Sequence, residues 1–253
     1  MTRVAAVGDI HCGRNGQGTF APLFAEISNA ADVLALCGDL TDYGTAEEAR
    51  VLARELSALR IPAVAVLGNH DVESGQEAEV TQILRDAGLV VLDGDAHELA
   101  GVGFAGTKGF CGGFGRGALG AWGEATVKRF VHEAIDEALK LESALARLRV
   151  EQRVALLHYA PVRATVEGEP LEIFPYLGSS RLEEPINRYP VSAVLHGHAH
   201  NGSPEGRTTA GAPVYNVAFP LMRKRFPDRP PYRILELPRG ATAAEAPSEA
   251  GAR

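Results

Sequence analysis

The chain has 253 residues, of which 45% are hydrophobic and 23% charged, and its formal net charge is −7. This composition is ordinary for a water-soluble globular protein, and the length suits one large α/β domain. The negative charge argues against a general nucleic-acid binder, which needs a basic face to displace counterions. An anionic substrate stays possible if positive charge is supplied locally.

Membrane and disulfide-rich classes are also disfavoured. The apolar runs are only as long as β-strands, and residues 1–10 lack the charged and apolar regions of a secretory signal. We therefore expect a cytoplasmic protein with no membrane partner. Cys12, Cys37 and Cys111 are widely spaced and form no C-x-x-C pair, which argues against a disulfide framework or a cysteine zinc site. We expect Cys12 and Cys37 to be packing residues.

Strand and helix patterns alternate through the first third of the chain. Thr45 and Glu48 match a capping box at the start of one helix, and Pro62 follows its end. Such alternation is typical of βαβ units and predicts a sheet with parallel strands. The expected strands are 3–7, 32–37 and 63–67, and the expected helices are 20–31, 45–60 and 76–87.

A long helix is predicted over 124–149, and it follows two less regular segments. Residues 89–105 predict two or three short strands around a turn at 93–95. Eight glycines between 106 and 123 predict a surface loop near the site, or a disordered excursion. The charges of the helix are expected to be solvated. Its apolar stripe would consist of Val127, Val131, Ile135, Leu139, Leu145 and Leu148.

The last third predicts strands over 153–157 and 191–195. Between them, segment 160–190 is rich in proline and irregular, and we interpret it as a cap around a short helix. Segments 206–218 and 231–237 are predicted to be hairpin strands that close a second sheet. Ala, Gly, Glu, Pro and Ser dominate from Pro238 onward. We therefore expect one domain over 1–237 and a disordered tail over 238–253.

Polar clusters end five of the predicted strands. In an open α/β sheet the carboxyl ends of parallel strands lie along one edge, where ligands bind. Side chains two apart on an extended backbone point the same way, so each D-x-H or H-x-H pair presents two groups to one side. The five clusters are Asp9 with His11, Asp39, Asn69-His70-Asp71 after Gly68, His158, and His198 with His200.

Each cluster taken singly also has a plain structural explanation. Asp9 and Asp39 could cap helices or turns, and His11 and His158 could be hydrogen-bonded loop histidines. The H-x-H pair is more specific, because two imidazoles on one face are a frequent metal-binding arrangement. The recurrence at five strand ends favours a joint site over coincidence.

The ordered motifs Asp9-x-His11, Gly38-Asp39, Gly68-Asn69-His70-Asp71, His158 and Gly197-His198-x-His200 resemble the calcineurin-like metallophosphoesterase family. The resemblance covers residues 3 to about 218. It implies an α/β fold in which a sandwich of two mixed β-sheets is flanked by α-helices, with two metal ions at the strand ends. It further implies these roles: Asp9, His11 and His200 on one metal, Asn69, His158 and His198 on the other, Asp39 as the bridge, and His70 as catalytic residue oriented by Asp71.

The resemblance leaves some residues without a role. His196 is not a ligand in the family pattern. Arg14 and the glycine-rich loop are candidates for substrate contact, but neither belongs to the family motifs.

Ligand chemistry agrees with this implied centre. Mixed imidazole, carboxylate and amide donors suit Mn²⁺, Fe or Zn²⁺. One bridging carboxylate lets two ions approach to about 3.5–4 Å, the separation that clamps a phosphoryl group. Two divalent ions contribute about +4 against about −2 from the two aspartates and −1 from a bridging hydroxide. About one positive charge remains, so an acidic protein can still hold a phosphate anion.

We predict metal-dependent hydrolysis of a small phosphate ester, a diester in preference to a monoester. A metal-bridging hydroxide would attack phosphorus, and His70 would assist the departing oxygen. One alternative is a nuclease acting on nucleic-acid ends, against which the net acidity and the lack of a basic stripe argue. The other is a non-catalytic scaffold of the same fold, against which the complete ligand set argues. The oligomeric state is left open.

Overall fold

The first sheet contains the alternating strands of the N-terminal third. The computed structural model describes residues 1–239. Four parallel strands in it are β1 (Thr2–Val7), β2 (Val33–Cys37), β3 (Ala63–Val66) and β4 (Leu89–Val91). A fifth strand, β11 (Arg233–Leu237), pairs antiparallel with β1, which gives the order β11-β1-β2-β3-β4.

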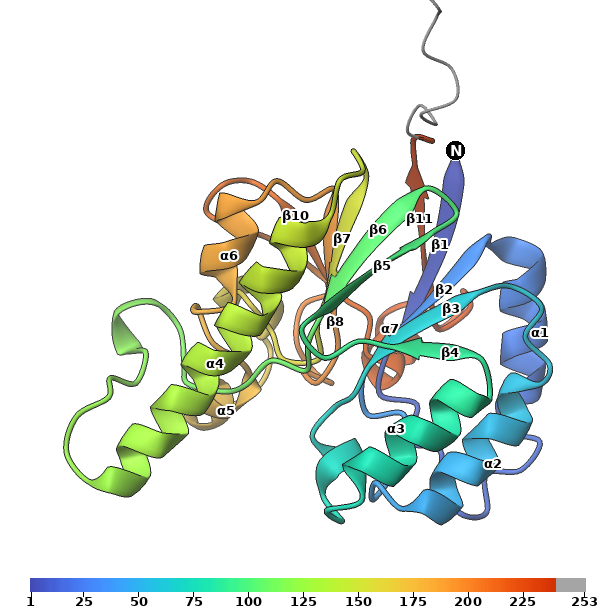
Figure 1. The fold of residues 1–253 in the computed structure, drawn as a ribbon, viewed down its shortest axis with the longest axis horizontal. Helices are drawn as coiled ribbons and strands as arrows, with labels where there is room; N and C mark the ends of the chain where they lie inside the picture. The colour runs from blue at the N-terminus through green and yellow to red at the C-terminus, as the bar shows by residue number, and fades with distance from the viewer. Residues whose placement is uncertain (240–253) are drawn as a thin grey trace, which may run out of the picture.

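Three helices cover the outer face of this sheet (Figure 1): α1 (Ala21–Ala30), α2 (Ala46–Leu56) and α3 (Glu77–Asp86). The predicted capping box at α2 is present. The Thr45 hydroxyl accepts from the Glu48 backbone N–H at 3.3 Å, and the Glu48 carboxylate accepts from the Thr45 backbone N–H at 3.1 Å. The alternation therefore folds locally as the sequence predicts.

The second sheet holds the strands of the C-terminal part. Its order is β5-β6-β7-β8-β10-β9, with parallel pairing from β6 to β10 and an antiparallel strand at each edge. Helices α4 (Ala125–Arg147) and α6 (Glu183–Arg188) cover its outer face (Figure 1). The strands are β5 (Asp95–Leu99), β6 (Val102–Gly106), β7 (Arg153–Leu156), β8 (Ala193–His196), β9 (Glu205–Arg207) and β10 (Pro213–Asn216).

The two sheets pack face to face around one apolar layer. In β1, Val4 and Ala6 point to this layer, whereas Ala5 and Val7 point to the helices on the other side. Every second residue of a strand faces the same way, so a strand covered on both faces is apolar throughout. The predicted sandwich of two mixed sheets flanked by helices is confirmed.

The final strand corrects one prediction. Segment 206–218 lies at the edge of the second sheet as predicted, where it forms a hairpin of its own from β9 and β10. Segment 231–237 does not join it, because the helix α7 (Phe219–Arg225) intervenes and β11 returns to β1 of the first sheet. The hydrophobic pattern marks a strand, but it does not specify which sheet edge the strand pairs with.

The predicted stripe of helix α4 is buried in part: Val131, Leu145 and Leu148 pack inward, whereas Val127 and Leu139 are exposed. Leu139 is 56% exposed, whereas Glu137, expected in solvent, is 2% exposed. The Glu137 carboxylate accepts from the Thr107 hydroxyl at 2.6 Å, the Gly109 backbone N–H at 2.7 Å and Lys140 Nζ at 2.8 Å. Burial of this carboxylate is tolerated because its charge is paired and hydrogen-bonded. It ties the start of the glycine-rich loop to α4.

Residues 240–253, most of the predicted tail, lie outside the described residues, and the division at residue 237 stays a prediction. Within residues 1–239, no helix is both long and apolar enough to cross a bilayer.

Candidate metal centre

Strand ends from both sheets converge at one edge of the sandwich. The Asp9 backbone N–H donates to the Gly38 carbonyl at 2.9 Å, which joins the ends of β1 and β2. His158, directly beyond β7 and the adjoining Leu157, donates from its ring Nδ1 to the Cys37 carbonyl at 2.9 Å. This bond connects the second sheet to the first. Polar clusters more than 100 residues apart thus meet in one place.

The first donor group consists of Asp9, His11 and His200. Ligand atoms of these three residues all lie within 4.8 Å of one another. His200 Nε2 is 2.9 Å from Asp9 Oδ1. The loop carrying His200 is held by the His198 backbone N–H, which donates to the Asp9 carboxylate at 2.9 Å.

The second donor group consists of Asp39, His158 and His198, with Asn69 beside it. The two histidines and Asp39 place ligand atoms within 4.8 Å of one another. His158 Nε2 lies 2.9 Å from Asn69 Oδ1 and 3.4 Å from Asp39 Oδ2. The His158 and His198 rings meet with centroids 4.8 Å apart. The three predicted donors of the second ion and the predicted bridge are therefore together.

Asp39 stands between the two groups. Its Oδ2 atom is 3.4 Å from His158 Nε2 and 3.8 Å from His11 Nε2, and its Oδ1 atom accepts from the His70 backbone N–H at 2.9 Å. One carboxylate oxygen is thus fixed by the backbone while the other faces both groups. This is the position that a bridging ligand needs.

Hydrogen bonds to backbone carbonyls leave ring nitrogens free for ligation. His158 Nδ1 and His198 Nε2 donate to the carbonyls of Cys37 and Tyr176, at 2.9 and 3.1 Å. The opposite nitrogens then carry lone pairs directed elsewhere, which is the arrangement that metal-binding histidines show. His11 Nε2 is buried and has no hydrogen-bond partner among residues 1–239. A buried polar atom without a partner is costly, and a cation at this atom would remove the cost. The donor set therefore fits a metal pair.

The electrostatics of the centre favour positive charge. Burial alone would lower the pKa of His158, but the Asp39 charge outweighs it and raises the pKa to about 9. A hydrogen bond donated to Asp9 raises the pKa of His200. Burial, reinforced by the charge of His158, lowers the pKa of His198 to about 4. The two buried carboxylates thus attract either protons or metal ions to the same nitrogens, so metal binding competes with protonation.

Backbone strain is concentrated in the same residues. Asp9, His11, Asp39 and His198 have positive φ angles of 57°, 44°, 47° and 70°. Within residues 1–239, Ala100 is the one other non-glycine residue with positive φ. Such conformations cost roughly 1–3 kcal/mol each and cluster at functional sites. The strain supports a functional role for these four residues.

Two glycines permit the close approach of the ligand loops. A Cβ atom on Gly68 would lie 2.1 Å from Asp39 Oδ1, and one on Gly197 would lie 2.2 Å from Asp9 Oδ2. Either contact is far inside van der Waals distance. The glycines of the two motifs are therefore required by packing against the carboxylates.

His70 lies at the centre, but Asp71 does not orient it, so this expectation was wrong. The His70 ring is next to that of His11, with centroids 4.7 Å apart. Its Nδ1 atom donates to the Asp42 carbonyl at 2.7 Å. The Asp71 carboxylate is buried and instead accepts from the backbone N–H groups of Leu40, Thr41 and Gly68 and from the Thr41 hydroxyl.

Asp42 lies at the same site, although the sequence motifs did not predict it. Its carbonyl positions His70, and its carboxylate Oδ1 lies 3.6 Å from His11 Nδ1. It forms a third donor group with His11 and His70. Asp42 lies in the polar run directly after the strand that precedes Asp39. This position is the feature of the sequence that could have indicated it. His196, by contrast, is buried with both ring nitrogens in hydrogen bonds, to Thr165 and to the Gly197 carbonyl.

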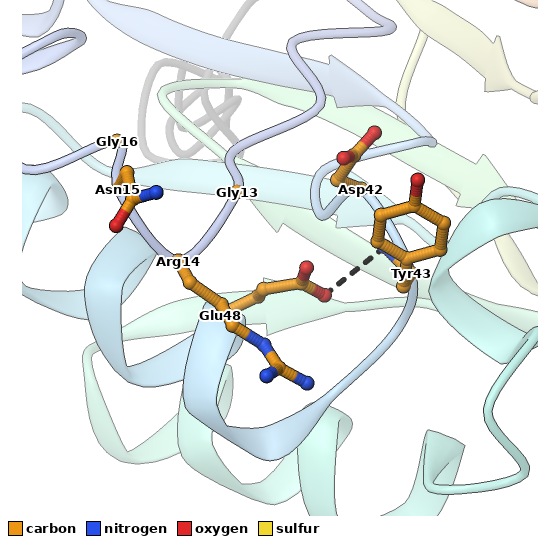
Figure 2. A pocket seen from close by; sticks show the side chains of 7 residues that line it. All are labelled: Gly13, Arg14, Asn15, Gly16, Asp42, Tyr43 and Glu48. Atoms are coloured by element: carbon orange, nitrogen blue, oxygen red, sulfur yellow. Dashed lines mark hydrogen bonds between the residues drawn. The ribbon is translucent and has the colours of Figure 1, made fainter.

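A cavity of about 610 Å³ adjoins the centre through Asp42. Figure 2 shows the 13–16 loop on one side of it and Asp42 with Tyr43 on the other. Arg14 lines this cavity and pairs with Glu47 at 3.3 Å. The start of the glycine-rich loop reaches the centre, where the Lys108 carbonyl accepts from the His158 backbone N–H at 3.0 Å.

A two-sheet α/β sandwich with histidine, carboxylate and amide donors at its strand ends is the architecture of a metal-dependent phosphoester hydrolase. The family model for calcineurin-like phosphoesterases matches residues 2–202, and the chain belongs to this family. The resemblance seen in the sequence is confirmed. No protein with a curated description matches the sequence.

Solved structures share the fold at low identity. The phosphopantetheinyl hydrolase of Mycobacterium tuberculosis is 15% identical, with 96% of this chain and 98% of that chain covered and a TM-score of 0.66. A protein of Thermus thermophilus is 18% identical, with 87% and 91% covered and a TM-score of 0.52. A putative 5′-nucleotidase of Staphylococcus aureus is 15% identical, with 85% and 48% covered and a TM-score of 0.51. At these identities the likeness concerns the fold alone.

Proposed function

We propose that this protein hydrolyses a small phosphate ester, a diester in preference to a monoester, with two metal ions at the strand-end centre. The observation that carries the proposal is the position of Asp39 Oδ2, which faces His11 and His158 at 3.8 and 3.4 Å. Two donor groups that share one carboxylate suit a pair of ions better than a single one.

The residues that would hold the ions follow from the two donor groups. Asp9, His11 and His200 would bind one ion, and Asn69, His158 and His198 the other, with Asp39 shared. This donor chemistry suits manganese, iron or zinc. When bound, such a pair makes a water-derived nucleophile available near neutral pH and stabilises negative charge on phosphoryl oxygens.

His70 would be the residue that moves a proton. Its Nδ1–H is occupied by the Asp42 carbonyl, so Nε2 is the atom that can exchange a proton with the ester oxygen. A neutral carbonyl acceptor at Nδ1 is compatible with both the protonated and the neutral ring. Asn69 would contribute an uncharged oxygen, which preserves the positive charge that draws an anionic substrate.

Substrate-panel hydrolysis by metal-loaded protein tests the proposal. The protein is stripped of metal, reloaded with Mn²⁺, Zn²⁺ or Fe²⁺, and assayed with bis(p-nitrophenyl) phosphate and p-nitrophenyl phosphate. The name of the Mycobacterium tuberculosis neighbour makes phosphopantetheinyl esters a sensible addition. We expect two ions per chain by elemental analysis and faster diester than monoester hydrolysis.

Two results would contradict the proposal. Protein that binds two ions yet hydrolyses no ester of the panel would favour the non-catalytic scaffold. Degradation of a single-stranded oligonucleotide at physiological salt, without hydrolysis of small esters, would favour the nuclease.

We also propose that the partner of this protein is a small phosphoester and that the protein is cytoplasmic. The fold by itself shows neither.

A further inference from the structure

The short helix α7 begins at the same edge of the sandwich as the metal centre. It follows β10, which runs parallel to β8, so both strands end at that edge. The Phe219 backbone N–H donates to the Gly8 carbonyl at 2.9 Å, directly before Asp9. In Figure 1, α7 lies where β1 ends. The start of the helix therefore lies next to the end of β1, directly before Asp9.

This helix carries three consecutive cations in an acidic protein, namely Arg223, Lys224 and Arg225. All three side chains belong to exposed residues. None has a carboxylate within salt-bridge distance among the described residues. These three residues form a short basic segment in an otherwise acidic chain. Three exposed cations without carboxylate partners in residues 1–239 give this part of a protein of net charge −7 a local positive potential, which attracts anions.

Lys224 contacts the loop that carries His200. Its Nζ atom donates to Asn201 Oδ1 at 2.9 Å, and Asn201 directly follows His200. The Asn201 backbone N–H and side-chain Nδ2 donate to the Glu169 carboxylate at 2.6 and 3.3 Å, which leaves Oδ1 for Lys224. The ammonium group is thus held beside the His200 loop by a neutral acceptor, with its charge not cancelled at that contact.

Arg223 is restrained by the first turn of its own helix. Its guanidinium lies over the Phe219 ring at 5.6 Å, and Phe219 in turn packs against Phe20, at the end of the loop that follows His11. Stacking on an aromatic ring restrains the guanidinium but leaves its five donors available.

We propose that Lys224, assisted by Arg223, forms a subsite for a second anionic group of the substrate, next to the ester that is hydrolysed. This proposal rests on the function proposed above and names its substrate class: phosphate esters that carry a further phosphate within one sugar-length of the scissile group. Lysine supplies a flexible point charge and arginine a fixed pair of donors, and both bind phosphate.

Arg229 provides a matched control. It carries the same charge and stacks on Phe226, but it lines a separate cavity of about 390 Å³ with Met222, Tyr232 and Ile234. A general attraction between the basic segment and any anion would involve Arg229 as much as Lys224. A subsite at the metal centre would involve Lys224 and not Arg229.

The test compares two substrates that differ by one phosphate. Thymidine 5′-(p-nitrophenyl phosphate) is assayed with and without a 3′-phosphate on Mn²⁺-loaded wild type, Lys224→Gln and Arg229→Gln. We expect wild type to prefer the 3′-phosphorylated ester by about tenfold in kcat/KM. This ratio corresponds to the free energy of one hydrogen bond to a charged group. Lys224→Gln should lower this ratio to about one, whereas Arg229→Gln should keep it.

Other outcomes would overturn the subsite. An equal loss for both substrates in Lys224→Gln would show that Lys224 only positions the His200 loop. An equal fall of the ratio in Arg229→Gln would show a general field, as expected for a nucleic-acid-binding surface. Calorimetric binding of thymidine 3′,5′-bisphosphate against thymidine 5′-phosphate gives a readout without turnover. If wild type hydrolyses nothing, the function fails, while a Lys224-dependent difference in binding still supports the subsite and its absence refutes it.

Discussion

The Nδ1 atom of His70 lies 2.7 Å from the backbone carbonyl oxygen of Asp42, which belongs to the loop after β2 rather than to the motif that contains His70. The bond fixes the ring against His11, with centroids 4.7 Å apart, and leaves Nε2 as the free nitrogen. Because the acceptor is a main-chain atom, no side chain is needed to set the tautomer. The loops after β2 and β3 therefore hold the His70 ring jointly.

Replacing His70 by alanine should lower kcat without removing the metals. The ring is not part of either donor group that shares Asp39, whereas proton transfer to a departing oxygen is typically worth about 10²–10⁴-fold. Elemental analysis and steady-state kinetics on bis(p-nitrophenyl) phosphate measure both properties. His132→Ala, which removes an exposed histidine of α4, is the control. A variant that loses an ion would place His70 among the ligands instead.

Asp39→Asn should weaken metal binding itself. The substitution keeps the shape of the side chain but removes the charge that faces His11 and His158. We expect an affinity loss of about 100-fold or more, since even residues outside the ligand set cost about 10–100-fold. Calorimetric titration with Mn²⁺ measures it, with the exposed Asp228→Asn as control. Unchanged metal content would disprove the bridging assignment.

Asp71→Asn should destabilise the fold even in metal-free protein. The two carboxylate oxygens accept four buried hydrogen bonds, and an amide NH₂ would face donors on one side. Each buried donor left without an acceptor costs about 1–3 kcal/mol in the free energy of unfolding. Urea denaturation with chelator measures the change, against the exposed Asp136→Asn. If stability were unchanged and the pH profile of kcat shifted, Asp71 would act on His70 after all.

Glu55 should make stability depend on pH in the acid range. Burial alone would raise its pKa, but hydrogen bonds from the backbone N–H groups of Gly18, Ala21 and Phe20 outweigh burial and lower it. A carboxyl group with a lowered folded-state pKa stabilises the protein above its unfolded pKa of about 4.3. That stability is lost as the pH falls through the folded pKa.

The measurement is the free energy of unfolding of wild type and Glu55→Gln between pH 3 and 7. The variant should be less stable near pH 7 by about 1–3 kcal/mol, the size of hydrogen bonds to a charged group. The difference should shrink below about pH 4. A difference that stays constant down to pH 3 would show that packing, and not the ionised carboxylate, anchors the 18–21 loop to α2.

The residue sequence by itself determined most strands and helices of the two sheets, and it marked the candidate donors that the fold brings together. Strands can be recognised as short apolar runs, and the α2 capping box can be recognised from Thr45 and Glu48. Both features depend on residues near one another in the chain. The donors could be predicted to meet, although they span residues 9 to 200, because parallel strands bring their carboxyl ends to one edge. That rule needs no side-chain detail.

Tertiary structure decided which groups the polar side chains contact. Asp71 bonds to the loop after β2, Glu137 turns inward under Thr107, and Lys224 reaches Asn201 beside His200. β11 pairs with β1 although its pattern would suit either sheet. Hydrogen-bond partners and sheet edges are chosen by packing between segments distant in the chain, and periodicity within one segment carries no information about them.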